Sequence, residues 1–138
     1  MEMMIVVVII GLVAGITFPG LSSGLETLRM TQASDSLVSF LNGALNRAER
    51  RQEVIEVAVS PRENAVWMRS AEATFVRKLE MPSGIRIVAA EERRFLLLPG
   101  ATVPRFGVEL VSARGARRIV SVDPITGVPR VERLEERR

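Results

Sequence analysis

The first 25 residues constrain this chain more than any other stretch, because they combine one charged side chain with a long apolar run. Glu2 is followed by 23 uncharged residues, 3–25, before the next charge at Glu26. Roughly 20 apolar helical residues, each rising about 1.5 Å, cross the hydrocarbon core of a bilayer. Residues 3–18 contain no polar side chain other than Thr17. The composition therefore predicts a membrane-spanning helix over residues 1–25.

Two residues of this segment allow a more specific interpretation. An ionisable side chain inside an apolar span costs on the order of 2.5–3.5 kcal/mol near the helix centre, so Glu2 is a candidate functional residue. Its position equally allows a polar side chain in the headgroup region at an exposed terminus. Pro19 lacks a backbone N–H. It predicts either a bend in a continuous helix or the end of the membrane helix, with a separate helix after it.

After residue 20 the sequence takes on the spacing of an amphipathic helix. Apolar side chains recur at steps of three and four residues, which is the pattern of a helix with one buried face. They are Leu21, Leu25, Leu28, Leu37, Leu41, Ala44, Leu45 and Ala48. The helix is therefore expected to continue to about residue 52, as a rod of roughly 75 Å. Its second half, residues 26–52, is expected to pack on a head.

From residue 53 the apolar period becomes two, which is typical of half-buried strands. The predicted strands are 55–59, 65–69, 74–79, 85–88, 93–98, 106–110, 119–122 and 128–131, the first two paired as a hairpin. We predict an α+β fold in which a long N-terminal helix, membrane-spanning in its first half, packs on a small, mainly antiparallel β head. The head covers residues 53–131, and residues 132–138 are expected to be a solvated charged tail.

The residues needed for most enzyme chemistry are missing. Cysteine and histidine are absent, which removes thiolate ligands, disulfides and the commonest general base. The run S-D-S at 34–36 has no histidine partner, and the pair E-E at 91–92 is followed by two arginines, as in a solvated charged turn. No phosphate-binding glycine loop or metal-ligand pattern is present. The sequence therefore predicts no enzyme activity, no cofactor and no metal.

A glutamate, the run M-M-I-V-V-V-I-I-G-L-V-A-G-I after it, and a proline 17 residues after the glutamate resemble the N-terminal helix of type IV pilins and type II secretion pseudopilins. In that family a prepilin peptidase cleaves between a glycine and a phenylalanine ahead of the glutamate, and the new N-terminus is methylated. Met1 stands where the last aliphatic residue before the glutamate would be. The resemblance thus implies a start codon further upstream or a trimmed processed end.

Two later segments refine the resemblance. F-L-L-L-P-G-A-T and R-R-I-V-S-V-D-P-I-T-G-V-P-R-V are similar to the C-terminal half of H-type minor pseudopilins and of the related FimT-like minor pilins. The resemblance implies a non-enzymatic subunit of a type II secretion pseudopilus, with helices bundled at the filament centre and heads outside. Glu2 would neutralise the N-terminal amine of a neighbouring subunit. The small residues Gly11, Ala14 and Gly15 would allow close helix approach.

The same resemblance implies partners and a location. The partners would be other pseudopilins, the inner-membrane secretion machinery, the prepilin peptidase and inner-membrane lipid, with the head contacting neighbouring minor pseudopilins or secreted cargo. The chain would cross the bacterial inner membrane once and place its head in the periplasm. The alternative function is a type IV minor pilin that binds DNA for uptake.

The alternative rests on arginines concentrated in the last quarter of the chain, among which Arg117, Arg118 and Arg130 are candidates for phosphate contacts. Glu132 and two further glutamates interrupt the cluster, and no Tyr or Trp lies nearby to stack on bases. The sequence favours a solvated charged rim here, so DNA is not an expected partner.

Overall fold

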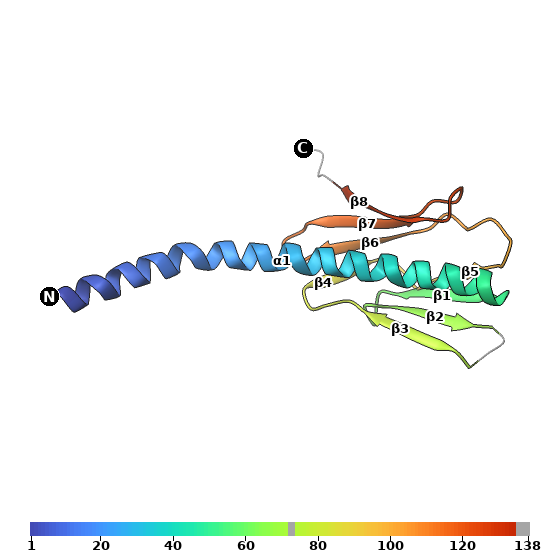
Figure 1. The fold of residues 1–138 in the computed structure, drawn as a ribbon, viewed down its shortest axis with the longest axis horizontal. Coiled ribbons are helices and arrows are strands. Elements are labelled where there is room, and N and C mark those ends of the chain that lie inside the picture. The colour runs from blue at the N-terminus through green and yellow to red at the C-terminus, as the bar shows by residue number, and fades with distance from the viewer. Residues whose placement is uncertain (72–73, 135–138) are drawn as a thin grey trace.

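The chain folds as one long helix followed by strands in two sheets, which confirms the predicted α+β arrangement (Figure 1). The computed structural model describes residues 1–71 and 74–134, and the side chains of all of these except residues 18 and 19. Helix α1 spans Glu2–Arg51. Its first half projects from the head as a bare rod, and its second half runs along the head (Figure 1).

Helix α1 is continuous over its whole length. Its backbone stays helical through position 19, so a separate second helix does not form, and the rod is only gently bowed (Figure 1). The side chain of Pro19 lies outside the described residues. The helix ends at Arg51, close to the expected end at about residue 52. It ends there because Gln52 takes the left-handed conformation (φ 51°, ψ 43°), and the Gln52 Nε2 donates to the Glu49 carbonyl at 2.6 Å.

The described strands form two antiparallel sheets of four. The first sheet has the order β3-β2-β1-β5, with β1 at Ile55–Ser60, β2 at Ala65–Ser70, β3 at Val76–Glu80 and β5 at Arg93–Leu97. The second has the order β4-β6-β7-β8, with β4 at Ile85–Val88, β6 at Gly107–Ser112, β7 at Arg117–Val122 and β8 at Pro129–Leu134. The pairing of β1 with β2 confirms the predicted hairpin.

β4 has the predicted bounds, and the other strands differ from the prediction by one to three residues at one end or both, most clearly β3 and β8. β3 begins at Val76 rather than at residue 74, because Phe75 closes the β2–β3 connection by accepting a 3.1 Å hydrogen bond from the Ser70 N–H. β8 continues to Leu134, three residues into the segment expected to be a solvated tail. Backbone pairing with β7 holds these residues, since Leu134 lies opposite Arg117. Residues 135–138 of the predicted tail lie outside the described residues.

The second half of α1 supplies one face of the core and packs against both sheets. Its buried side chains recur every three or four residues, as expected for a helix with one buried face. They are Met30, Ala33, Ser34, Leu37, Phe40, Leu41, Ala44 and Ala48. They join inward-facing side chains of both sheets, such as Val57 and Met68 of the first and Leu110 and Val120 of the second. The predicted helix–head packing is therefore confirmed over this half.

The head covers only part of the predicted apolar stripe. Leu21, Leu25 and Leu28 are 59%, 53% and 66% exposed, and the first buried residue of α1 is Met30. Helical periodicity continues through these leucines, but the sheets do not extend far enough along α1 to cover them (Figure 1). These three side chains therefore belong to the surface of the projecting helix.

Polar contacts clamp the head at two places. Asn64, with φ at 52°, uses its side-chain amide to donate to the Ile85 carbonyl at 2.7 Å and to accept from the Ile87 N–H at 2.8 Å. This links the β1–β2 turn of the first sheet to β4 of the second. Near the other end, the Arg47 Nε pairs with Glu53 Oε1 at 2.7 Å, which ties the end of α1 to the start of the first sheet.

Candidate assembly and membrane site

The part of α1 that precedes the head is a bare apolar rod, which we call the arm (residues 2–21). Each of its large apolar side chains that the structure describes is at least 53% exposed. α1 is long and apolar enough to cross a membrane, and no part of its most apolar stretch is buried by the rest of the chain. Burying one Val, Leu or Ile side chain is worth about 1.5–3 kcal/mol. The head does not bury the arm, and an apolar environment outside the head would stabilise it.

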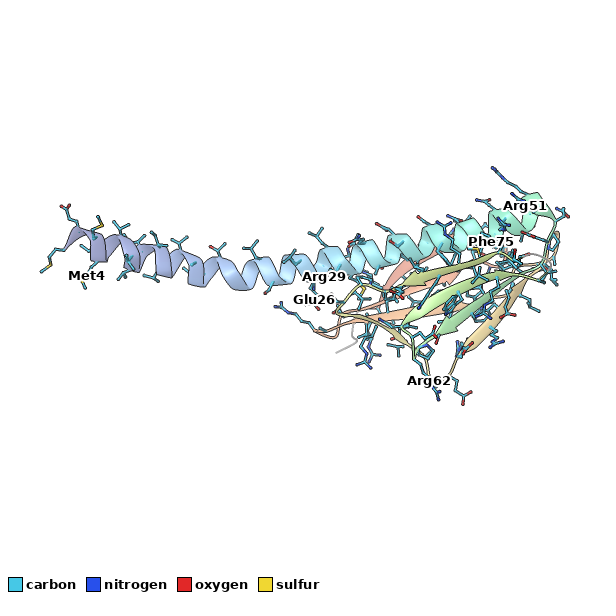
Figure 2. The ribbon with its side chains drawn as sticks, turned by 90° about the horizontal axis from the view of Figure 1, so that it is seen from below. Met4, Glu26, Arg29, Arg51, Arg62 and Phe75 are labelled. Carbon is cyan, nitrogen blue, oxygen red and sulfur yellow. The ribbon has the colours of Figure 1, made fainter. Side chains whose placement is uncertain are left out.

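Glu2 lies in the first turn of α1, at the tip of the arm, the end of the helix at which Figure 2 labels Met4. A carboxylate in this turn interacts favourably with the positive end of the helix dipole. It makes no capping hydrogen bond to the helix, and no ion pair with another described residue. The Glu2 side chain is exposed at this end of the helix.

The small residues of the arm lie on two opposite faces. Gly11, Ala14 and Gly15 share one face, because they are three and four residues apart. A Cβ added at Gly11 or Gly15 would meet no atom within 4 Å, so a second helix has room to approach closely. Gly20 and Gly24 are equally open. Each follows one of the first two glycines by nine residues, about 900° of rotation, which puts it on the opposite face.

Gly20 and Gly24 were not predicted as site residues, although their spacing is visible in the sequence. The signal that could have found them is the second small-xxx-small pair within the apolar run. Four of their neighbours, Ile16, Leu21, Leu25 and Leu28, line an open groove with them on the surface of the helix. The arm and the residues after it therefore offer helix-packing surfaces on two sides rather than one.

The head contacts α1 just after the arm through one arginine of the β6–β7 turn. We call residues 22–29 of α1 the neck. The Arg114 backbone N–H donates to Glu26 Oε1 at 3.0 Å, its Nε pairs with Glu26 Oε2 at 3.0 Å, and its Nη2 donates to Ser22 Oγ at 3.0 Å. A hydrogen bond from Ser112, and then those from Arg114, hold the pKa of Glu26 below its ordinary value of 4.5.

This contact joins the β6–β7 turn of the head to the neck. It joins residues 88 and 92 positions apart in the sequence, so no local pattern could have predicted it. Figure 2 shows Glu26 and Arg29 at the end of the head from which the arm projects. Arg114 was not predicted as a site residue, and it is the arginine most closely joined to the helix.

The structure does not bring the three arginines of the DNA-binding alternative together. Arg117 and Arg118 begin β7, at the neck end of the second sheet, whereas Arg130 lies opposite Ser121, about 10 Å further along the strands. The Arg130 Nη2 is 4.0 Å from Asp123 Oδ2. The Ile125 N–H, and to a smaller extent Arg130, hold the pKa of Asp123 below its usual range.

Arg133, in β8, is the arginine that the fold brings beside Arg118. The two arginines lie directly opposite each other across the β7–β8 ladder. Because β8 was expected to end at residue 131, this juxtaposition was not predicted. The basic residues that the fold gathers are therefore Arg114, Arg117, Arg118 and Arg133, all near the neck.

Two of the remaining polar candidates, Ser34 and Glu92, have structural partners. The buried Ser34 hydroxyl donates to the Met30 carbonyl at 2.8 Å, so it is held within the helix. Glu92 pairs with the Arg94 Nε at 3.1 Å, as in the charged turn inferred from the sequence. Over residues 1–71 and 74–134 there is no group of three or more Asp, Glu, His or Cys side chains that could hold a metal ion.

The fold and the arm together describe a class of protein, namely a small β head carried on a single helix that is long and apolar enough to span a membrane. No protein-family model, curated protein sequence or solved structure matches the chain. A more specific assignment therefore depends on the chemistry of the arm and on the sequence resemblance.

Proposed function

We propose that this chain is a non-enzymatic minor pseudopilin of a type II secretion system, which assembles through its arm and contacts partner pseudopilins or secreted cargo through its head. The observation that carries the proposal is the exposed arm, with Glu2 at its tip, continuous with a helix that is buried in the head. A simple anchor needs only an apolar span. A carboxylate at the tip and small residues on two faces favour helix–helix assembly.

The arm has two successive environments in this proposal. In the inner membrane its side chains contact lipid, and ten aliphatic side chains contribute on the order of 15–30 kcal/mol to keeping it there. In the filament the same side chains contact the arms of neighbouring subunits, which are as apolar as lipid. Close packing at Gly11 and Gly15 on one face, and at Gly20 and Gly24 on the other, then favours the helix bundle.

Glu2 selects the partner during this transfer. A carboxylate surrounded by apolar side chains is destabilising unless a cation neutralises it. The amino terminus of a neighbouring subunit, freed and methylated after cleavage by the prepilin peptidase, supplies that cation. Pairing Glu2 with this amine fixes the axial register between two arms, whereas the apolar contacts alone would tolerate sliding.

Replacement of Glu2 by leucine tests the proposal. A photocrosslinking residue in place of Leu12 would report contacts of the arm in the native membrane, and resistance to carbonate extraction would report insertion. We expect Glu2→Leu to insert as fully as the parent, because the span becomes more apolar. An unpaired buried charge on the partner costs about 3–5 kcal/mol, so crosslinked adducts with other pseudopilins should fall at least about tenfold.

The matched control is Glu91→Leu, the same change on an exposed turn of the head. It should leave the yield of adducts unchanged. If Glu2→Leu also gives adducts at the parent yield, the carboxylate does not select the partner and the assembly role fails. If the parent chain is removed from membranes by carbonate, the membrane-spanning role fails as well.

A further inference from the structure

The end of the head next to the neck contains a basic cavity. It has a volume of about 450 Å³ and lies between the neck and the ends of β6, β7 and β8. Four arginines and one glutamate are the charged residues that line it: Arg114, Arg117, Arg118, Arg133 and Glu26. The Glu26 carboxylate is engaged by Arg114, and Arg117 pairs with Glu109 at 3.3 Å. An excess of positive charge therefore remains on Arg118 and Arg133.

Arg118 and Arg133 have an unfavourable arrangement within the chain itself. They are direct neighbours across β7 and β8, where opposed side chains have Cβ atoms about 4.5–5.5 Å apart and like charges are destabilising. Among the residues that the structure describes, neither has a carboxylate within 4.0 Å; the Arg118 Nη1 donates to the neutral Thr31 Oγ1 at 3.2 Å. An anion between the two guanidinium groups would relieve their repulsion.

The position of the cavity along α1 indicates which anion reaches it. From Met3 to Ser22 there are 20 residues, roughly 30 Å of helix, which matches the thickness of a hydrocarbon core. Ser22 is therefore at the depth where lipid headgroups begin, and Arg114 is hydrogen-bonded to it. The β6–β7 turn and the end of β8 both lie at this end of the head (Figure 1).

We propose that the cavity binds the phosphate of an anionic phospholipid, such as phosphatidylglycerol, in the bilayer that the arm spans. The inference rests on the membrane-spanning role proposed above. Arginine forms paired N–H···O hydrogen bonds with phosphate oxygens. Arg118 and Arg133 supply two such groups side by side, and Arg29 lies exposed in the adjoining neck (Figure 2). The bound lipid seats the head against the membrane surface and fixes its orientation before assembly.

The test uses the full chain in bilayers and the absence of native cysteine. Ala113→Cys, in the exposed β6–β7 turn, carries a fluorophore, and the lipid includes a fixed fraction of a headgroup-attached spin-label quencher. Quenching is compared between pure phosphatidylcholine vesicles and vesicles with about one-third phosphatidylglycerol. A label at Thr102→Cys, in the loop at the far end of the head, gives the background. Carbonate extraction reports insertion separately.

We expect quenching at position 113 to increase in phosphatidylglycerol vesicles and to decrease again at high salt. Arg118→Gln with Arg133→Gln should abolish the increase, because each arginine near the surface changes the ratio of seated to lifted heads by roughly fivefold. The matched control is Arg62→Gln with Arg105→Gln, which removes the same charge from exposed positions away from the cavity. It should leave the increase intact. Circular dichroism checks that both double variants are folded.

Four results would overturn the inference. Equal quenching in the two kinds of vesicle by an inserted chain would remove the lipid site and leave the membrane span standing. Equal loss in the control variant would show that only net charge matters. The detergent-solubilised chain could instead bind a DNA duplex and lose that binding in the double variant Arg118→Gln with Arg133→Gln. If phosphatidylglycerol also had no effect on quenching, the cavity would be assigned to nucleic acid. Failure of insertion would remove the proposed function and the inference together.

Discussion

Leu37→Ala, compared with Leu28→Ala, tests the division of α1 into an exposed arm and neck and a buried half. The sequence predicts both leucines as core residues on one apolar stripe, nine residues apart. In the structure Leu37 is 0% exposed and belongs to the core that joins both sheets, whereas Leu28 is 66% exposed. The two substitutions remove the same atoms from the same helix. Their difference therefore isolates burial against the head.

The expected magnitudes are well separated. Leucine-to-alanine changes in packed cores lower the free energy of unfolding by about 2–5 kcal/mol, with the larger values where the cavity cannot collapse. Leu37 is packed among residues of a helix and of both sheets, so it is expected in the upper half of that range. An exposed substitution such as Leu28→Ala should stay within about 0.5 kcal/mol. With a urea slope of about 1–3 kcal/mol per molar, the Leu37→Ala midpoint should fall by about 1–5 M, or about 2 M at a slope near the middle of that range.

Fluorescence of Trp67 provides the assay, on the full chain in mild detergent. It is the only tryptophan. Its Nε1 donates to Glu63 Oε2 at 2.7 Å and the Lys78 ammonium lies 4.9 Å from its ring centre, so unfolding of the first sheet changes its surroundings. The detergent keeps the arm solvated in all variants. Equal midpoint shifts for the two substitutions would refute the placement of the first buried residue at Met30.

Two further predictions use the same unfolding measurement. Asn64→Gly keeps the positive φ but removes the hydrogen bonds to Ile85 and Ile87, so it should lower the free energy of unfolding by about 1–3 kcal/mol. Asn64→Ala should lower it by about 1–2 kcal/mol more, because alanine is strained at that φ. A glycine variant as stable as the parent would contradict a stabilising role for these two hydrogen bonds. Because the pKa of Glu26 is lowered on folding, its ionised form stabilises the folded state above pH 4.5, and that contribution is lost as the pH falls through the lowered pKa. The difference between the urea midpoints of the parent and Glu26→Gln should be constant above about pH 5 and shrink below pH 4.5. A difference that does not depend on pH would show that the charge of the Glu26 carboxylate does not stabilise its contact with Arg114.

The elements of the fold could largely be predicted because they depend on local periodicity. A stepwise apolar pattern predicted α1 to within one residue of its end at Arg51, and alternation located the strands. Periodicity does not say where the covering sheets stop, so the same apolar stripe contains the exposed Leu28 and the buried Leu37. It also does not say which strands pair, so the division of the strands between two sheets came only from the structure.

The candidate site was predictable only where it lies within one helix. Glu2, Gly11 and Gly15 follow from the composition of the apolar run and from the resemblance it carries. The contact of Arg114 with Glu26 and the juxtaposition of Arg118 with Arg133 depend on chain segments that meet only after folding. The charges of these side chains can be read from the sequence. Which of them come into contact cannot, because the residues are far apart along the chain.

The continuity of α1 has a mechanical consequence. The arm and the buried second half belong to one helix, and no loop interrupts α1 between Glu2 and Arg51. A pull on the arm, as when it leaves a membrane, would therefore act on the buried half as well. A force along the arm is therefore transmitted directly to the head, where it acts as shear between α1 and the sheets. The Arg47–Glu53 pair at the far end of the head and the Arg114–Glu26 pair at the near end oppose sliding of α1 along the sheets. Rotation of the arm about its own axis likewise turns the whole head, so the arm and the head rotate together.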